Sequence, residues 1–284
     1  MRDSPGLRYD GEFSYPSECR MPTAVSADHL QHELAKVPAV TLGFWVIKIL
    51  ATTLGETAGD SVTMSMDLGY LAGTAIFAAL LAVALAAQIR ASRFHPALFW
   101  IVIVATTTVG TTLADLCDRS LGIGYLGGST LLFALLMLTL FLWHRSLGSV
   151  SIKRLDTRKG ELFYWLTILF SQTLGTALGD WVADSDTGWG LGYEGGAALF
   201  GAGLLVVVAL YLWTRTSRTA LFWAAFILTR PLGATVGDFL DKPIANGGLA
   251  LSRYTASGAL ILCMLVLVFL LPQRAERLEA APVD

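Results

Sequence analysis

The sequence predicts an all-α polytopic membrane helix bundle, with eight transmembrane helices formed by four tandem parallel two-helix repeats. Three observations predict it: apolar runs of membrane-spanning length, a pattern that recurs four times, and an uneven distribution of lysine and arginine. Hydrophobic residues make up 54% of the 284 residues and charged residues 15%, and the mean hydropathy is +0.60. About 20 apolar helical residues cross a hydrocarbon core, so runs such as Tyr70–Ala87 and Ala197–Trp213 indicate an integral membrane protein.

The first helix of each repeat carries landmarks at fixed spacing. An opening Trp is followed by Gly after ten residues, by a small residue after fourteen and by Asp after fifteen. The four copies are WVIKILATTLGETAGD (Trp45–Asp60), WIVIVATTTVGTTLAD (Trp100–Asp115), WLTILFSQTLGTALGD (Trp165–Asp180) and WAAFILTRPLGATVGD (Trp223–Asp238). Self-similarity at one spacing indicates a repeat architecture. We expect the landmark Trp to lie at the level of the lipid headgroups as an anchor.

The second helix of each repeat is an apolar run, which opens GYLAG, GYLGG or GYEGG in three units and RYTAS in the fourth. Small residues let membrane helices approach closely, so we expect the two helices of one unit to cross near these residues. In chain order the predicted helices span 39–60, 68–89, 96–116, 123–144, 161–181, 190–213, 218–239 and 250–271. They form a bundle over 38–271, with repeats at about 45–89, 100–144, 165–213 and 223–271, between tails at 1–37 and 272–284.

Lysine and arginine predict the topology. Fifteen of the twenty fall in the tails and in the loops on one side of the bundle. The opposite side holds Arg119, Lys242 and Arg253. The positive-inside rule therefore predicts that both tails are cytoplasmic. Every unit then enters and leaves on the same side, so the repeats are parallel rather than inverted.

Three stretches carry a resemblance to a known family: KVPAVTLGFWVIKILATTLGETAGD, YWLTILFSQTLGTALGD and FWAAFILTRPLGATVGDFLDKP. They resemble the bacterial membrane-protein family built from tandem repeats of unknown function with a landmark tryptophan. The resemblance covers about Lys36 to Leu271. It implies a multi-pass protein of the bacterial inner membrane and brings no activity or substrate with it.

The repeated aspartates are the first candidate site residues. Each ends a first helix, where the helix dipole disfavours an anion by a few tenths to about 1 kcal/mol. Two interpretations stay open. Each Asp could cap the following segment by accepting backbone N–H groups, or the four could converge on a pseudo-symmetry axis and bind a cation, since hard divalent ions prefer oxygen ligands. The candidate metal ligands are Glu56, Asp60, Asp115, Asp180 and Asp238.

Two cations lie deeper, near the middle of the first and seventh predicted helices. Lys48 and Arg230 would each cost about 2.5–3.5 kcal/mol at the bilayer centre, so they need partners on other helices. We expect these two helices to face each other across a polar interior. Pro231 is expected to kink or unwind its helix. Lys48 and Arg230 join Glu56 and the four aspartates as candidate substrate- or ion-binding residues.

These residues favour a secondary transporter or permease for a small ion, preferably a cation such as a divalent metal, or a proton-coupled solute. One alternative is a non-transporting scaffold or accessory protein with structural ion pairs. Another is an anion permease that uses Lys48 and Arg230. No phosphate-binding loop and no nucleophile–base pattern is present, and the four histidines lie at the edges, so we expect no enzyme and no cofactor. The expected partners are the lipid bilayer and a small ion or solute, with a possible homo-oligomer and no nucleic acid.

Overall fold

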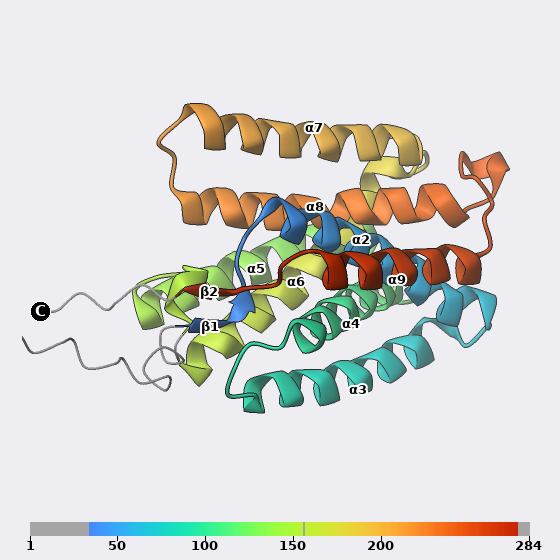
Figure 1. The fold of residues 1–284 in the computed structure, drawn as a ribbon. Coiled ribbons are helices and arrows are strands. Elements are labelled where there is room, and N and C mark those ends of the chain that lie inside the picture. Colours follow the sequence, from blue (N-terminus) through green and yellow to red (C-terminus); the bar gives the residue numbers. More distant parts are fainter. Residues whose placement is uncertain (1–33, 156, 278–284) are drawn as a thin grey trace, which may run out of the picture.

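The computed structural model describes residues 34–155 and 157–277 (Figure 1). In this part of the chain, eight long helices alternate between an inner ring and an outer layer. The inner helices are α2 (Leu42–Asp60), α4 (Pro96–Asp115), α6 (Arg158–Ala183) and α8 (Arg218–Asp241). The outer helices are α3 (Gly69–Arg90), α5 (Tyr125–Leu147), α7 (Gly192–Trp213) and α9 (Arg253–Leu270).

The inner helices close into a ring in which α2 and α6 each lie between α4 and α8. Glycine makes this closure possible. A methyl group at Gly55 would overlap Thr107 of the next repeat, one at Gly175 would overlap Arg230, and one at Gly233 would overlap Thr52 of the first repeat. The landmark Gly of each of these helices therefore packs against a residue of the following repeat, the one that lies seven positions after its Trp. This close approach confirms that the inner helices pack at small residues.

Each outer helix packs mainly against the inner helix of the following repeat. Thus α3 packs on α4, α5 on α6, α7 on α8, and α9 returns to α2. The expectation that the two helices of one unit cross near their small residues was wrong. Among the glycines of the outer helices, Gly196 lies against Thr235 of the next unit, and Gly73 lies against Thr63, in the turn between α2 and α3.

Membrane-spanning character is clear for six helices of the described ranges. By length and composition α3, α4, α5, α7, α8 and α9 could each cross a membrane. The helices α2 and α6 are not among the six. Lys48, Glu56 and Asp60 lower the hydropathy of α2, and Asp180 is one of several charged residues in α6.

The two ends of the described chain meet in a small sheet. Strand β1 (Leu34–Pro38) pairs antiparallel with β2 (Ala275–Arg277). Lys36 Nζ lies 2.7 Å from the carboxylate of Glu161 at the start of α6 and donates to the carbonyl of Ile89 at 3.1 Å. The sheet therefore lies at the end of the bundle where the inner helices begin.

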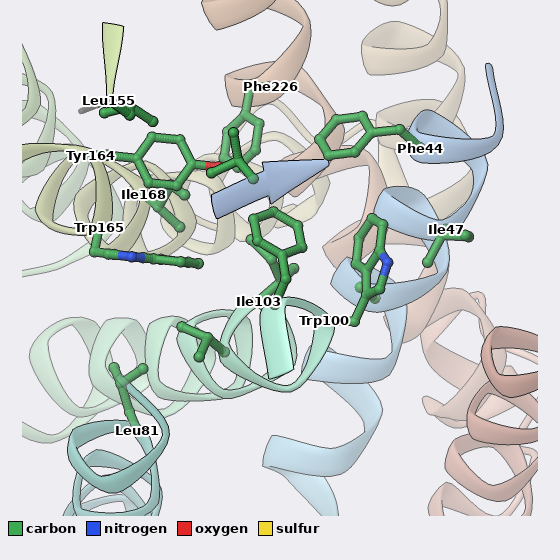
Figure 2. Close-up of a cluster of buried hydrophobic side chains, with 14 of the residues drawn as sticks. Phe44, Ile47, Leu81, Trp100, Ile103, Leu155, Tyr164, Trp165, Ile168 and Phe226 are labelled. Atoms are coloured by element: carbon green, nitrogen blue, oxygen red, sulfur yellow. The ribbon is translucent and has the colours of Figure 1, made fainter. Parts of the chain in front are cut away.

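An aromatic cluster closes the ring at that same end (Figure 2). Phe44, Phe99, Tyr164 and Phe226 are buried there together with three landmark tryptophans, Trp100, Trp165 and Trp223. Trp223 Nε1 donates to the Val150 carbonyl at 3.0 Å. The landmark tryptophans were expected to anchor the protein at the level of the lipid headgroups, but these three are buried inside the bundle. Trp100 and Trp165 each follow a buried aromatic residue, Phe99 and Tyr164, whereas Trp223 follows the partly buried Phe222.

Helix α8 continues through Pro231 from Arg218 to Asp241. The expected unwinding does not occur. The proline ring packs close to Gly175 of α6, where no side chain competes for space. Thr52 Oγ1 donates to the carbonyl of Thr229 at 3.2 Å and so adds a bond across helices beside the proline.

Candidate ion-binding site

The positions 3, 7, 11 and 15 after each landmark Trp lie about one turn apart along the inner helices, and all sixteen side chains there are buried. They form four layers along the ring. The lysine layer holds Lys48, Ile103, Ile168 and Phe226. The arginine layer holds Thr52, Thr107, Gln172 and Arg230. The glutamate layer holds Glu56, Thr111, Thr176 and Ala234, and the aspartate layer holds Asp60, Asp115, Asp180 and Asp238.

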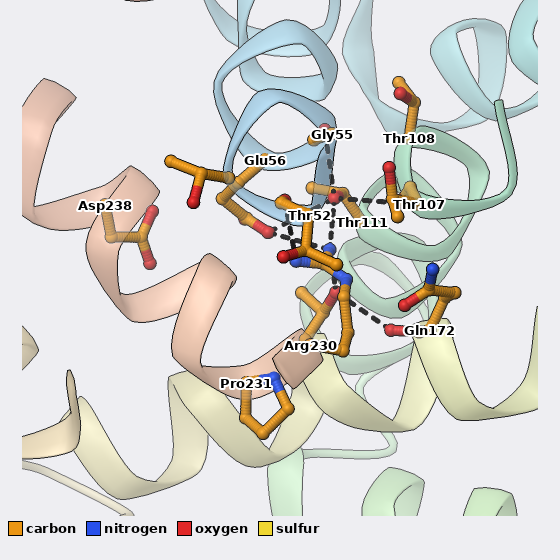
Figure 3. Close-up of polar contacts among 12 residues, drawn as sticks. Thr52, Gly55, Glu56, Thr107, Thr108, Thr111, Gln172, Arg230, Pro231 and Asp238 are labelled. Atoms are coloured by element: carbon orange, nitrogen blue, oxygen red, sulfur yellow. Dashed lines mark hydrogen bonds and ion pairs between the residues drawn. The ribbon is translucent and has the colours of Figure 1, made fainter. Parts of the chain in front are cut away.

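Arg230 connects all four repeats through the glutamate layer (Figure 3). Its Nη2 atom lies 2.9 Å from Glu56 Oε2 and also donates to Thr176 Oγ1 and, at 2.6 Å, to Thr111 Oγ1. Its Nη1 atom donates to the Thr52 carbonyl at 3.4 Å. The need for partners on other helices is thus met for Arg230. The helices α2 and α8 are neighbours in the ring, so the expectation that they face each other across the interior was wrong.

The aspartate layer is divided into two pairs, each held by one cation. Lys242 bonds Asp60 and lies 3.1 Å from Asp238. Arg119 lies 2.7 Å from Asp115 and 3.5 Å from Asp180. Each cation lies four residues after the aspartate of its own repeat and also contacts the aspartate of a second repeat. Arg119 thus links repeats 2 and 3, and Lys242 links repeats 4 and 1.

The third cation at this end is Arg253, the residue that replaces glycine in RYTAS. Its Nε atom lies 3.2 Å from Asp241 and 3.8 Å from Asp60. Burial alone would lower the pKa of Lys242, which lies beyond the end of α8, but the carboxylates of Asp238, Asp60 and Asp241 raise it well above its usual value. Lys242 therefore stays protonated, and the cations neutralise much of the carboxylate charge.

The capping interpretation does not describe Asp60 or Asp115. Short π-helical turns, Ser61–Ser65 and Leu116–Ser120, follow Asp60 and Asp115 directly. In these described segments neither aspartate accepts a hydrogen bond from a backbone N–H of the turn that it precedes. The backbone stays helical there, so its N–H groups already bond to carbonyls of the preceding turn, and the carboxylates turn to the cations instead.

Three carboxylates approach closely enough to share one ion. Glu56, Asp60 and Asp238 each offer an oxygen within 4.8 Å of the other two, and all three are buried. Two oxygens on opposite sides of a Ca²⁺ ion lie about 5 Å apart, so this spacing fits a small cation. Asp60 Oδ1 is buried and has no hydrogen-bond partner among the described residues. Asp115 and Asp180 are not brought into this group and are held by Arg119.

Four successive blocks, residues 43–94, 98–149, 163–217 and 221–277, match the family described as "Repeat of Unknown Function (DUF347)". The chain belongs to the DUF347 family. No curated protein and no solved structure matches the chain.

Lys48 differs from the other predicted site residues. Its side chain is fully buried, and its Nζ atom has no hydrogen-bond partner within the described ranges. It lies 4.1 Å from the centre of the Phe226 ring. It therefore belongs to the polar axis but not to the ion-pair network around Glu56.

Arg119 and Lys242 were not predicted as site residues, whereas Arg253 was considered as a further contact in the anion alternative. A signal was present for both, because they are cations on the acidic side of the bundle and each follows a repeated Asp by one helical turn. Thr111 and Thr176 were also missed. Single threonines are common in membrane helices, and only the contact with Arg230 distinguishes these two.

Proposed function

We propose that this protein is a secondary permease that moves a small cation along the axis enclosed by α2, α4, α6 and α8. The observation that carries this proposal is the convergence of Glu56, Asp60 and Asp238, three buried carboxylates at a spacing that one ion can bridge. Buried ionisable residues within membrane helices are costly and usually mark an ion path. The axis is polar at the end that holds these carboxylates and is closed at the opposite end by the aromatic cluster (Figure 2). Alternating access requires a path that is closed at one end at a time.

In this proposal all eight helices cross the bacterial inner membrane and both tails are cytoplasmic. Charged residues lower the hydropathy of α2 and α6 below that of the six apolar helices. These residues, which include Lys48, Glu56 and Asp180, are buried inside the protein rather than exposed to lipid. The excess of lysine and arginine on one side supports the orientation. The buried carboxylates then lie near the non-cytoplasmic end of the bundle.

Lys242 acts as the internal competitor of the transported ion. Its ammonium contacts two of the three carboxylates, so an entering cation has to displace it. Arg230 plays the same part for Glu56. Such exchange keeps the buried charge balanced in both states, which avoids the large cost of an unpaired buried carboxylate. This supports cation transport with the charged side chains changing partners as the site loads.

Flux measurements test the proposal. The purified protein is reconstituted in liposomes, and uptake of Mg²⁺, Ca²⁺, Mn²⁺, Na⁺ and protons is followed against protein-free liposomes. For the ion that is transported, Asp60→Asn should slow the initial rate at least about tenfold, because a contact to a charged group contributes about 1.5–3 kcal/mol.

Asp67→Asn is the matched control, because Asp67 is an exposed acid that follows the same helix α2. Its positive φ of 54° suits asparagine. The control should transport at the wild-type rate. The proposal is wrong if no ion enters faster than in protein-free liposomes, or if Asp60→Asn and Asp67→Asn behave alike.

A scaffold is the second candidate function, and one observation favours it. The Glu56–Arg230 pair is braced by Thr52, Thr111 and Thr176, so that it ties the four repeats together. In a scaffold this pair would serve stability alone. Variants that keep the fold but lose the carboxylates would then show no loss of flux, because the wild-type protein would have none.

A further inference from the structure

Polar atoms without partners gather in the lysine and arginine layers. Lys48 Nζ, both amide atoms of Gln172 and Arg230 Nε have no hydrogen-bond partner among the described residues. All three side chains are fully buried. An ammonium has three donors, an amide two and a guanidinium Nε–H one, whereas the single acceptor among these atoms is the Gln172 oxygen. This part of the axis therefore has a large excess of hydrogen-bond donors over acceptors.

The fold does not satisfy Lys48. The charged group that acts on it from nearby is Arg230, which is another cation. The face of the Phe226 ring attracts the ammonium but accepts none of its hydrogen bonds in the ordinary sense. The remaining members of its layer are Ile103 and Ile168, which are apolar. A buried ammonium in such surroundings is stabilised by an anion.

Gln172 also lacks hydrogen-bond partners among the described residues, whereas the threonines at the same position of repeats 1 and 2 have them. Thr52 donates to the Ile49 carbonyl at 2.7 Å, and Thr107 donates to the Val104 carbonyl at 2.9 Å. Each hydroxyl is thus satisfied by its own helix. Gln172 is too long for that bond and lies on the side of α6 that faces Arg230 (Figure 3). Its amide can therefore form hydrogen bonds with a ligand bound on the axis.

We infer that Lys48, Gln172 and Arg230 form a site for a small monocarboxylate, which crosses the membrane together with the cation of the proposed permease. The carboxylate oxygens accept hydrogen bonds from Lys48, Gln172 and Arg230 Nε, and the short alkyl part contacts Ile103 and Ile168. This inference rests on the proposed function for the coupling, but binding of the anion can be tested by itself.

Arg230 links the two sites. Its Nη2 atom holds Glu56, and its Nε atom is left for the anion. A carboxylate bound at Nε competes with Glu56 for the same guanidinium charge. Glu56 is then released to bind the cation beside Asp60 and Asp238. Each substrate therefore favours binding of the other, which is the condition for symport.

The test is a thermal unfolding titration of the full-length protein in detergent, with sodium acetate against sodium chloride at constant ionic strength. Acetate should raise the unfolding midpoint of the wild type in a saturable manner, on the order of 3 °C at a tenfold excess over Kd. Chloride should raise it far less. Lys48→Met should remove the acetate effect, and Gln172→Leu should weaken it.

Lys48→Met also separates binding from folding. Methionine has a similar size and leaves no unpartnered donor, so the variant without acetate should unfold at or above the wild-type midpoint. Lys159→Met, at an exposed lysine of α6, is the control and should keep the full acetate effect. The inference is overturned if Lys48→Met keeps the acetate shift, or if chloride and acetate act equally.

Flux distinguishes this inference from the proposed function. If acetate stabilises the wild type through Lys48 but no cation moves, the anion site stands and the permease proposal falls. If a cation moves through Asp60 at a rate independent of acetate, and acetate gives no shift, the permease stands and the anion site falls. Symport requires that acetate accelerates cation uptake in the wild type and not in Lys48→Met.

Discussion

Arg230 shows how a single buried charge can be kept in a membrane bundle. It contacts Glu56, Thr111 and Thr176, and thereby all three other repeats. Two hydroxyls and one carboxylate replace the water that a guanidinium would otherwise bind. The space for its stem is provided by Gly175, where a side chain would overlap it. The charge is therefore stabilised by groups from the entire ring.

Removing this charge should be costly unless its partner is also removed. Arg230→Met leaves Glu56 buried and unpaired, and we expect a loss of about 3–5 kcal/mol in the free energy of unfolding. Arg230→Met combined with Glu56→Gln should regain most of that loss. The free energies are measured by denaturant titration in detergent micelles. Additive losses in the double variant would show that the two side chains do not act as a pair.

At the scale of the element, the landmark glycines fix the distance between neighbouring inner helices. Gly175→Ala should destabilise the protein by about 1–3 kcal/mol, because the new methyl group would overlap Arg230 and meet Pro231 Cδ at 2.9 Å. Gly201→Ala in α7 is the matched control. No atom of the described residues lies within 4 Å of its added methyl group.

The control should be neutral or stabilising by up to about 1 kcal/mol, because alanine is the better helix former. The comparison is made by thermal unfolding in one detergent. Equal midpoints for the two alanine variants would mean that the crossing of α6 and α8 is not limited by the glycine.

The element boundaries were well predicted, but the pairing of helices was not. The Trp-to-Asp pattern located α2 and α4 to within a few residues, since each landmark serves a helix end or a crossing. Four equivalent repeats do not reveal whether an outer helix packs on its own unit or on the next. That choice depends on the loops that connect each inner helix to its outer helix, and these loops differ between the repeats.

The site was predicted in part for a related reason. The sequence pointed to Glu56, Asp60 and Asp238 because charged residues stand out in apolar helices. It gave no means to separate them from Asp115 and Asp180, since the aspartates are equivalent by repeat position. The separation arises from Arg119 and Lys242, which occur in two units of the four and divide the ring into halves.

At the scale of the whole molecule, the ring requires both halves of the chain. Repeats 1 and 2 supply α2 and α4, and their open sides are covered by α8 and α6. We expect fragments 1–148 and 149–284, expressed separately, to be degraded or aggregated, because each exposes half of the polar axis to lipid. Expressed together, they should copurify as one complex through a tag on either fragment.

The break between Gly148 and Ser149 lies in the segment that follows α5 and leaves each inner helix intact. Helix content measured by circular dichroism should match that of the unbroken protein. Recovery of the first fragment alone as a monodisperse, fully helical protein would contradict the closed ring as the folding unit.

The ring also separates two tasks that single helices usually combine. Helix spacing depends on the glycines, which recur in every repeat, whereas Lys48, Glu56 and Arg230 each occur in one repeat only. One repeat can therefore acquire a different side chain on the axis while the glycines of all four repeats keep the helix spacing unchanged. Substitutions at single axial positions can thus change the chemistry of the interior without changing the fold.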